Sequence, residues 1–278
     1  MSTPRENPAL VDAVKLPPQF RLLAFDDLDS TNEEAKRRAQ SADPGWLVVT
    51  AASQSAGRGR RGREWSSPEG NLYMSLLVRP ECSVADAGQI SFVTVVALGE
   101  ALRRLYEPMR QDSQNAIEFS YKWPNDMLAN GRKMSGILLE SESDGEGGLS
   151  WLVIGVGVNI NSHPAQTPFP ATDLTTEGCT GLSAADVLSA FCQSLADWYK
   201  RWQQEGFAPV RQAWLDHAQG LGREVVVRLP DREITGLFRA LNDDGVMILE
   251  MPDGSDQHIA AGDVFFSGPD NAPGERFR

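Results

Sequence analysis

One short segment, residues 57–65 with the sequence GRGRRGREW, constrains the fold of this chain more than any other. Its first seven residues hold three glycines and four arginines, in a protein whose formal net charge is −12. Glycine allows backbone conformations that other residues avoid, and it lets the main chain approach a ligand. Arginine carries a permanent charge on a planar group that pairs with carboxylates and phosphates. The segment is therefore predicted to be a mobile loop that wraps an anion.

The same letters satisfy the dinucleotide fingerprint G-x-G-x-x-G, but the surrounding chain does not support it. A strand is predicted before the loop at residues 46–52, and Glu81 follows about 20 residues after the last glycine, as that fingerprint requires. The fingerprint also needs a helix that begins within the glycines and meets pyrophosphate. Only nine residues, including one proline and one glycine, separate Gly62 from the strand predicted at 72–78. A doubly wound dinucleotide fold is therefore disfavoured.

Two other interpretations of the loop are a solvated basic segment and a contact with nucleic acid. No basic or aromatic cluster elsewhere in the sequence extends such a patch. The net charge of −12 would also repel a polyanion, so nucleic acid is the weaker alternative.

A second group of polar residues surrounds a hairpin predicted within residues 117–140. Its first strand ends in the letters YKWPND, an Ala-Asn-Gly turn follows, and its second strand begins with RKMSG. Because Pro124 does not fit a central strand, Asn125 and Asp126 are predicted at the strand's mouth, with Lys133 nearby. A carboxylate, an amide and a lysine at one end of a sheet suit nucleotide phosphates and a metal. From these residues alone, an ordinary charged hairpin is an equal alternative.

Four motifs in order make the chain resemble the biotin protein ligases. GRGRRGREW (57–65) resembles that family's biotin and adenylate loop, and KWPND (122–126) with RKMSG (132–136) resembles its second signature. DSTN (29–32) and GVGVNIN (155–161) resemble two further family elements. The resemblance implies an α+β fold of the class II aminoacyl-tRNA synthetase/biotin ligase type. Such a fold has a mixed central sheet with flanking helices, plus a small C-terminal SH3-like β-barrel.

The resemblance also implies roles for individual residues. The residues that would take part in catalysis are Lys133, Arg60 and Asp126. The residues that would bind biotin are Ser30, Thr31, Asn32, Gln54, Gly57, Arg58, Gly59, Arg60, Lys133 and Gly136. The residues that would bind ATP and the adenylate are Arg63, Trp65, Asn125, Asp126 and Asn159. Of these, Asn125 and Asp126 would be the ligands closest to Mg²⁺.

The activity implied by the resemblance is the ATP-dependent conversion of biotin to biotinyl-5′-AMP, with release of pyrophosphate. Biotin would then pass to a lysine of a biotin carboxyl carrier protein. ATP, biotin and Mg²⁺ would be needed, without a tightly bound prosthetic group. The alternatives are a lipoate or octanoate ligase of the same fold and a non-catalytic relative that keeps the pocket. The arginine-rich loop followed by Trp65 favours biotin, and the presence of Lys133 and Asp126 favours an enzyme.

Hydrophobic periodicity predicts the elements of the larger domain. The predicted strands outside the hairpin are 20–25, 46–52, 72–78 and 151–160. The last of these is largely apolar and is therefore expected at the centre of the sheet. The predicted helices are 29–40, 85–106, 183–205 and 207–218. Residues 161–181 are irregular and proline-bearing, which is typical of a functional or a disordered loop. The resemblance implies that this loop binds the adenylate and orders with ligand.

Capping boxes are predicted at two of these helices. One pairs Ser30 with Glu33, or Thr31 with Glu34, and the other involves Ser183 and Asp186. Ser30 and Thr31 could thus be caps alone, and their contact with biotin depends on the resemblance.

The C-terminal part of the chain changes to short alternating runs separated by turns, which predict a small β-barrel. These runs are 224–229, 233–240, 246–251 and 257–260. The predicted domains are a flexible N-terminal segment 1–19, a catalytic domain 20–220 and a C-terminal domain 221–278.

The remaining composition indicates where the protein acts. Three cysteines without paired spacing indicate a reducing compartment, and residues 1–19 lack the apolar core of a signal peptide. No run approaches a membrane span. About twenty residues before the first strand are too few for a DNA-binding helix-turn-helix. A cytoplasmic enzyme without DNA or membrane partners is expected, and the resemblance allows a homodimer formed through the central sheet.

Overall fold

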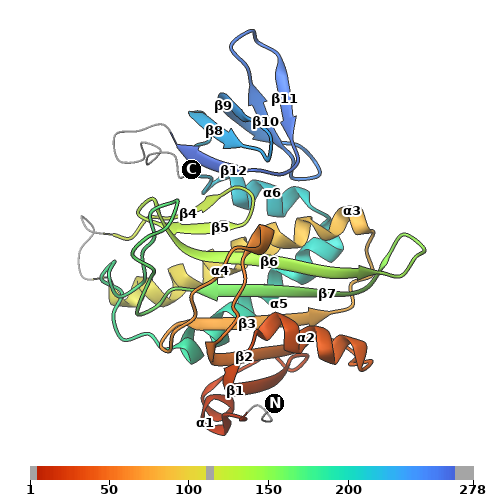
Figure 1. The fold of residues 1–278 in the computed structure, drawn as a ribbon, viewed down its shortest axis with the longest axis vertical. Coiled ribbons are helices and arrows are strands. Elements are labelled where there is room, and N and C mark those ends of the chain that lie inside the picture. Colours follow the sequence, from red (N-terminus) through yellow and green to blue (C-terminus); the bar gives the residue numbers. More distant parts are fainter. Residues whose placement is uncertain (1–4, 111–115, 267–278) are drawn as a thin grey trace.

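The computed structural model describes residues 5–110 and 116–266 (Figure 1). A seven-stranded sheet lies at its centre, with the strand order β1-β2-β3-β7-β6-β5-β4. The strands are β1 Arg21–Leu28, β2 Leu47–Gln54, β3 Leu72–Val78, β4 Phe119–Lys122, β5 Asp126–Ala129, β6 Arg132–Ser143 and β7 Leu149–Val158. β1 and β2 run parallel, and the other neighbouring pairs are antiparallel. The predicted mixed sheet is therefore confirmed, and the apolar strand β7 is central as expected.

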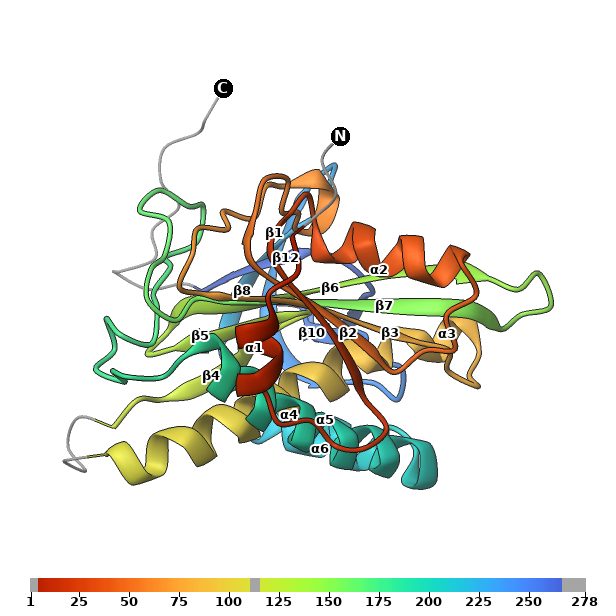
Figure 2. The ribbon, with the colours of Figure 1, turned by 90° about the horizontal axis from the view of Figure 1, so that it is seen from below.

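Helices cover both faces of this sheet (Figure 2). They are α1 Pro8–Ala13, α2 Thr31–Gln40, α3 Val84–Ala87, α4 Gln89–Tyr106, α5 Ala184–Glu205 and α6 Ala208–Leu215. α2 packs against β2, β3 and β7 on one face, whereas α4 and α5 lie on the opposite face. Both layers bury apolar surface against the sheet, which is the usual source of stability for such an arrangement.

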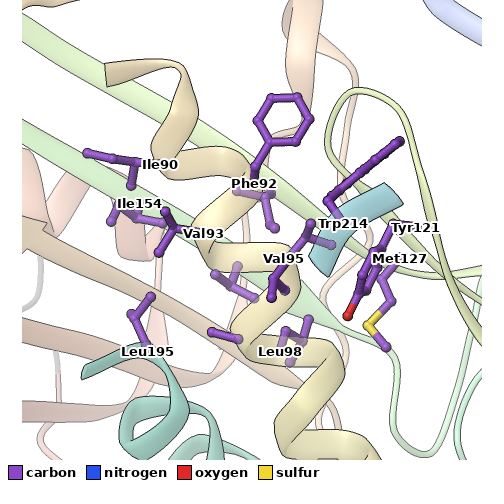
Figure 3. Packing of buried hydrophobic residues seen from close by; sticks show 14 of the residues in the cluster. Ile90, Phe92, Val93, Val95, Leu98, Tyr121, Met127, Ile154, Leu195 and Trp214 are labelled. Atoms are coloured by element: carbon purple, nitrogen blue, oxygen red, sulfur yellow. The ribbon is translucent and has the colours of Figure 1, made fainter. Parts of the chain in front are cut away.

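The larger hydrophobic core lies between the sheet and α4, with α5 alongside (Figure 3). Ile90, Val93 and Leu98 of α4 are fully buried, and so are Ile154 of β7 and Leu195 of α5. Contrary to the expectation from the sequence, residues 84–109 are long and apolar enough to cross a membrane by length and composition alone. However, 67% of the apolar 18-residue stretch within them is buried inside the protein. Burial on this scale identifies α4 as the core helix of a folded domain.

The predicted helix 85–106 is two helices that meet at Gly88. The capping box predicted at the start of α2 is wrong, because Ser30 forms no side-chain capping bond. Instead, Gln54 Oε1 accepts from the Thr31 N–H, so a neighbouring strand satisfies the helix terminus. The box of Ser183 and Asp186 at α5 is confirmed.

The predicted strand 117–126 ends early, because β4 stops at Lys122 and Asp126 begins β5. The proline between them cannot donate a ladder hydrogen bond, so the chain turns there. Asp126 thus opens a strand instead of closing one. The next turn has the predicted hairpin chemistry, since Asn130 and Gly131 both have positive φ, +48° and +75°.

The C-terminal domain is a five-stranded antiparallel sheet with the order β11-β10-β9-β8-β12. Its strands are β8 Glu224–Arg228, β9 Glu233–Leu241, β10 Met247–Glu250, β11 Asp256–Ile259 and β12 Asp263–Phe266. This sheet agrees with an SH3-like fold, although β11 and β12 are not paired in the described residues, so no closed barrel is formed. The sequence patterns indicated neither β12 nor the helix α1 in the N-terminal segment. Residues 1–4 and 267–278 of the two predicted end segments lie outside the described residues.

Candidate active site

A row of residues across four strands forms the floor of a cavity on the α2 face of the sheet. Asp126 of β5 pairs with Gly136 of β6, Gly136 pairs with Gly157 of β7, and Gly157 pairs with Tyr73 of β3. A Cβ atom added at Gly157 would lie 2.5 Å from the Trp65 ring, and one at Gly136 would lie 3.0 Å from it. Because these two positions lack side chains, Trp65 can lie directly over the floor.

Two lysines share one carboxylate beside this floor. Lys133 Nζ lies 2.6 Å from Asp126 Oδ1, and Lys122 Nζ lies 2.7 Å from Asp126 Oδ2. Lys122 and Asp126 are buried, whereas the side chain of Lys133 is 28% exposed and lies 5.5 Å from the centre of the Trp65 ring. One carboxylate between two ammonium groups leaves a net positive charge in the cavity.

The pKa values of this group follow from burial and from the neighbouring charges. Burial lowers the pKa of Lys133; Asp126 opposes that shift and Lys122 adds to it. Burial alone would raise the pKa of Asp126, but attraction to Lys122 and Lys133 outweighs burial and holds its pKa below the ordinary value. Asp126 is therefore ionised at neutral pH.

The N-terminus of α2 supplies the polar groups at a second part of the cavity. Gln54 Oε1 accepts from the backbone N–H of Thr31 at 2.8 Å and from its hydroxyl at 3.1 Å. Ser75 of β3 donates to Asn32 Oδ1 at 2.5 Å. A Cβ atom added at Gly155 would lie 2.3 Å from Asn32 Oδ1, so the missing side chain lets α2 approach the sheet. These contacts fix a row of hydroxyl and amide groups that faces the cavity.

The arginine loop, residues 57–65, supplies part of the cavity lining, and each of the loop's four guanidinium groups contacts a residue outside the loop. Arg58 contacts Glu33 of α2 and lies 3.4 Å from Glu140 of β6. Arg60 Nη1 donates to the amide oxygen of Asn125 at 3.1 Å. Arg61 and Arg63 both pair with Asp263 of β12.

Arg60 differs from the other loop arginines because its described partner is an amide and carries no charge. Burial lowers the pKa of its guanidinium, while attraction to Asp263 and Asp126 opposes that shift. An arginine without a paired carboxylate keeps its charge available to an anion that enters the cavity.

The irregular segment 161–181 forms one wall of the cavity, which Pro164, Thr167, Pro168, Phe169 and Ala171 line. It is attached to β6, because the Lys133 N–H donates to Pro170 O and Thr172 N–H donates to Lys133 O. The Phe169 ring lies 4.7 Å from Lys122 Nζ. Asn159 holds the same wall, since its side-chain amide donates to Thr172 O at 3.0 Å.

The structure brings the sequence-predicted site residues together with one exception. The predicted residues that line this cavity are Ser30, Thr31, Asn32, Gln54, Arg58, Gly59, Arg60, Arg63, Trp65, Asn125, Asp126, Lys133, Gly136 and Asn159. Gly57 does not line it, but its carbonyl oxygen accepts from the backbone N–H of Trp65. A Cβ atom there would lie 2.5 Å from both Ser67 Oγ and Trp65 O, so Gly57 is needed for close packing of the loop.

Other residues also line the cavity, and sequence reasoning assigned no role there to Lys122, Phe169, Asp263 or Phe265. Lys122 lies within the KWPND motif, and its spacing of four from Asp126 could have indicated the pair. Phe169 lies in the segment 161–181, which is predicted to be a ligand-binding loop, but nothing in the sequence singles out the residue itself. Asp263 and Phe265 come from a domain that is distant in sequence, and no local pattern indicates them.

The predicted magnesium ligands have other partners in this arrangement. Both carboxylate oxygens of Asp126 face lysines, and Asn125 Oδ1 accepts from Arg60. Among the described residues, no group of three or more His, Cys, Asp or Glu side chains could hold a metal. As arranged, Asn125 and Asp126 do not form a metal site, because an ion would have to displace a lysine or an arginine. Their assignment to Mg²⁺ therefore stays a prediction, and no step below depends on it.

The fold and the cavity together define a class of protein: a mixed sheet flanked by helices, with a cationic cavity that suits an anionic ligand. Residues 23–159 match the biotin/lipoate A/B protein ligase family, and residues 220–267 match the biotin protein ligase C-terminal domain. A biotin–[acetyl-CoA-carboxylase] ligase of Paracoccus denitrificans is 41% identical over 247 residues, which cover 86% of this chain and 98% of that protein. The chain therefore belongs to the biotin/lipoate A/B protein ligase family, and within it to the biotin protein ligases.

Further relatives agree with this assignment. A bifunctional ligase/repressor of Bacillus subtilis is 31% identical over 238 residues, which cover 84% of this chain and 70% of that protein. The biotin protein ligase of Aquifex aeolicus in complex with biotin and ATP has a similar structure, with a TM-score of 0.73 and 27% identity. That comparison covers 88% of this chain and 97% of the other.

Proposed function

We propose that the protein is an ATP-dependent biotin protein ligase. It activates biotin as biotinyl-5′-AMP, releases pyrophosphate, and transfers biotin to a lysine of a biotin carboxyl carrier protein. The observation that carries the proposal is the convergence of Lys122, Lys133 and Arg60 on one cavity in a chain of this family. The relatives' names and the match to the C-terminal domain favour biotin over lipoate or octanoate.

The first reaction joins a carboxylate to the α-phosphate of ATP, and these two anions repel each other. The lysine pair and Arg60 would offset that repulsion and stabilise the charge that develops as the carboxylate attacks phosphorus. Asp126 holds the ammonium group of Lys133 in place through a 2.6 Å contact. Within this proposal Lys133 and Arg60 act on the reacting groups, and Asp126 orients Lys133.

The two ends of the cavity differ in chemistry, and this difference supports a placement of the ligands. The hydroxyl and amide groups of the α2 end suit the ureido ring of biotin, and Gly136 leaves room beside Lys133 for its carboxylate. We place ATP against Arg63, Trp65, Asn125, Asp126 and Asn159. Asn159 would act through the wall that it holds, because its amide bonds to Thr172.

In the second reaction the neutral amine of the carrier lysine would attack the mixed anhydride and release AMP. The adenylate hydrolyses in water, so a loop that covers it protects the intermediate until the carrier arrives. Arg58, Gly59 and Arg60 lie in that loop. A cytoplasmic location, a homodimer, and the absence of DNA and membrane partners remain predictions.

Pyrophosphate exchange tests the activity directly. Purified protein is incubated with ATP, labelled pyrophosphate and biotin, lipoate or octanoate in separate reactions. We expect exchange in the biotin reaction and in neither of the other two. In a separate reaction with labelled biotin, the label should pass to a carrier domain and not to its Lys→Arg variant. Exchange with lipoate or octanoate would support the related ligase instead. No exchange with any acid would indicate a non-catalytic binding protein.

A further inference from the structure

Asp263 opens strand β12 of the C-terminal domain, yet its side chain reaches the arginine loop of the catalytic domain. Its Oδ2 lies 3.3 Å from Arg61 Nη1, and its Oδ1 lies 3.0 Å from Arg63 Nη2. The Asp263 side chain is 21% exposed, and Asp263 lines the same cavity as Lys133. One carboxylate therefore joins two loop residues that are some 200 positions away in the chain.

The β12 strand holds this carboxylate in a fixed place. Asp263 pairs with Arg228 in the ladder with β8, and the next residue, Val264, is buried in the core. Phe266 packs against Phe169 of the cavity wall with ring centres 6.0 Å apart. Because β12 is paired with β8 and its residues Val264 and Phe266 are packed, Asp263 is held in a fixed position relative to the loop.

The loop needs such a partner, because its charges and its backbone disfavour the observed conformation. Arg60, Arg61 and Arg63 repel one another at short range. Arg61 also has a φ of +57°, in the left-handed region where a side chain is strained. The carboxylate of Asp263 offsets the repulsion and holds the strained residue by its guanidinium. Asn125 is an uncharged partner, so it cannot replace Asp263 in this respect.

We propose that Asp263 is a positioning residue that holds the arginine loop over the cavity, so that closure of the site depends on the C-terminal domain. Arg58 ties the start of the loop to Glu33 and Glu140, and Asp263 ties its end. Arg60 lies between the two attachments and stays available to the ligand. In the setting of the proposed ligase activity, Asp263 retains biotinyl-5′-AMP through the loop without touching the reacting atoms.

The test begins without substrate. Asp263→Asn keeps the size of the side chain and removes its charge, and hydrogen–deuterium exchange is followed for the amides of residues 58–64. Loss of two partly exposed ion pairs should speed that exchange by about fivefold or more. Asp256→Asn is the matched control, because it removes one ion pair with Arg239 in the same domain, away from the loop. Equal exchange in the two variants would overturn the proposal.

Two further variants separate positioning from a general loss of structure. Asp263→Glu keeps the charge and should retain slow loop exchange. Arg61→Gln should speed loop exchange, as Asp263→Asn does. In the double variant, the acceleration of loop exchange should be smaller than the two single-variant effects combined, because both substitutions break the same contact. Full additivity in the double variant, or fast exchange in Asp263→Glu, would contradict the proposed contact.

The functional readout is the escape of the intermediate. With biotin and ATP, Asp263→Asn should label bystander lysines more strongly, relative to its rate of pyrophosphate exchange, than the parent protein or Asp256→Asn. An unchanged ratio would overturn the role in retention. Hydrogen–deuterium exchange of the loop is measured without biotin or ATP. The contact between Asp263 and the loop can therefore be contradicted independently of the proposed ligase activity.

Discussion

The carboxylate of Asp126 is the negative group that pairs with both lysines of the cavity. It is buried between two lysines, and a buried charge is stable only when it is paired. With one negative and two positive groups, the cluster keeps an excess positive charge where the proposed reaction gathers two anions. The same carboxylate keeps Lys133 beside Gly136, which has no side chain to fill the cavity floor.

Replacement of Lys133 tests that charge directly. Lys133→Ala should lower biotin-dependent pyrophosphate exchange by about 100-fold or more, the usual effect of removing one group that stabilises transition-state charge. Biotin binding, measured by calorimetry, should remain detectable because the α2 end of the cavity is untouched. Lys200→Ala, an exposed lysine on α5, is the control. Near-normal exchange in Lys133→Ala would refute the role.

The lowered pKa of Lys133 predicts how the activity depends on pH. Lys133 contributes only when protonated, and its pKa lies below the ordinary lysine value of 10.5. The exchange rate should therefore fall as pH rises through that lowered pKa, at a pH where a solvent-exposed lysine is still charged. A pH profile of the Lys133→Arg variant is the comparison, because guanidinium does not titrate in this range. If both proteins show the same alkaline decline, another group causes it.

At the scale of elements, strand β7 forms part of the cavity floor. Its glycines Gly155 and Gly157 are two residues apart and therefore lie on the same face of the sheet. Gly155 admits Asn32 of α2, and Gly157 admits the Trp65 ring of the arginine loop. The strand is central and both its neighbours are paired, so it can lack these side chains and remain in place. The same sheet thus buries apolar residues on the α4 face and leaves room for a ligand on the other.

Two glycine substitutions test different properties, one the affinity for ATP and the other the stability of the fold. Gly157→Ala places a methyl group 2.5 Å from the Trp65 ring and should displace the loop, which weakens nucleotide binding by about 1–3 kcal/mol. Gly88→Ala meets its nearest neighbour at 3.9 Å in a helical conformation, and it should raise stability by about 0.5–1 kcal/mol. Calorimetric titration with ATP and thermal unfolding measure the two effects. Unaltered ATP affinity in Gly157→Ala would show that nucleotide binding does not depend on the missing side chain at position 157.

On the scale of the whole molecule, the two domains share one hydrophobic core. Phe238 and Leu249 of the C-terminal sheet belong to the same buried cluster as Phe92 and Trp214 of the catalytic domain. Trp123 adds a hydrogen bond from its indole N–H to Gly245 O at 3.0 Å. Such continuity is expected to make both domains unfold together, and it gives β12 a rigid base from which Asp263 reaches the loop.

Truncation of that shared core tests the coupling. Phe238→Ala should lower the free energy of unfolding by about 3–5 kcal/mol, because a buried aromatic ring leaves a cavity. The loss should shift one transition that far-UV dichroism and tryptophan fluorescence report together. Leu237→Ala, on the exposed face of the same strand, should change little. Two separate transitions, with only one of them shifted, would show that the domains unfold independently.

The sequence by itself determined most of the elements, the mixed sheet and many of the residues that line the cavity. Strand 72–78 has its predicted bounds, since hydrophobic alternation and turn residues act between neighbours in the chain. The motifs predicted that Lys133, Arg60 and Asp126 lie at one site, and all three line the same cavity. The side-chain cap predicted for Ser30 failed at this level, because the Thr31 N–H at the start of the helix bonds to Gln54 from another strand.

Only the tertiary structure decided which charges meet. Asp263 faces Arg61 and Arg63, and Lys122 shares Asp126 with Lys133, because folding places their elements side by side. The lowered pKa of Lys133 also depends on burial, which no local pattern contains. The physical reason is that secondary structure responds to short-range sterics and periodicity. Electrostatic pairing and desolvation depend on distances in space between residues that are far apart in the chain.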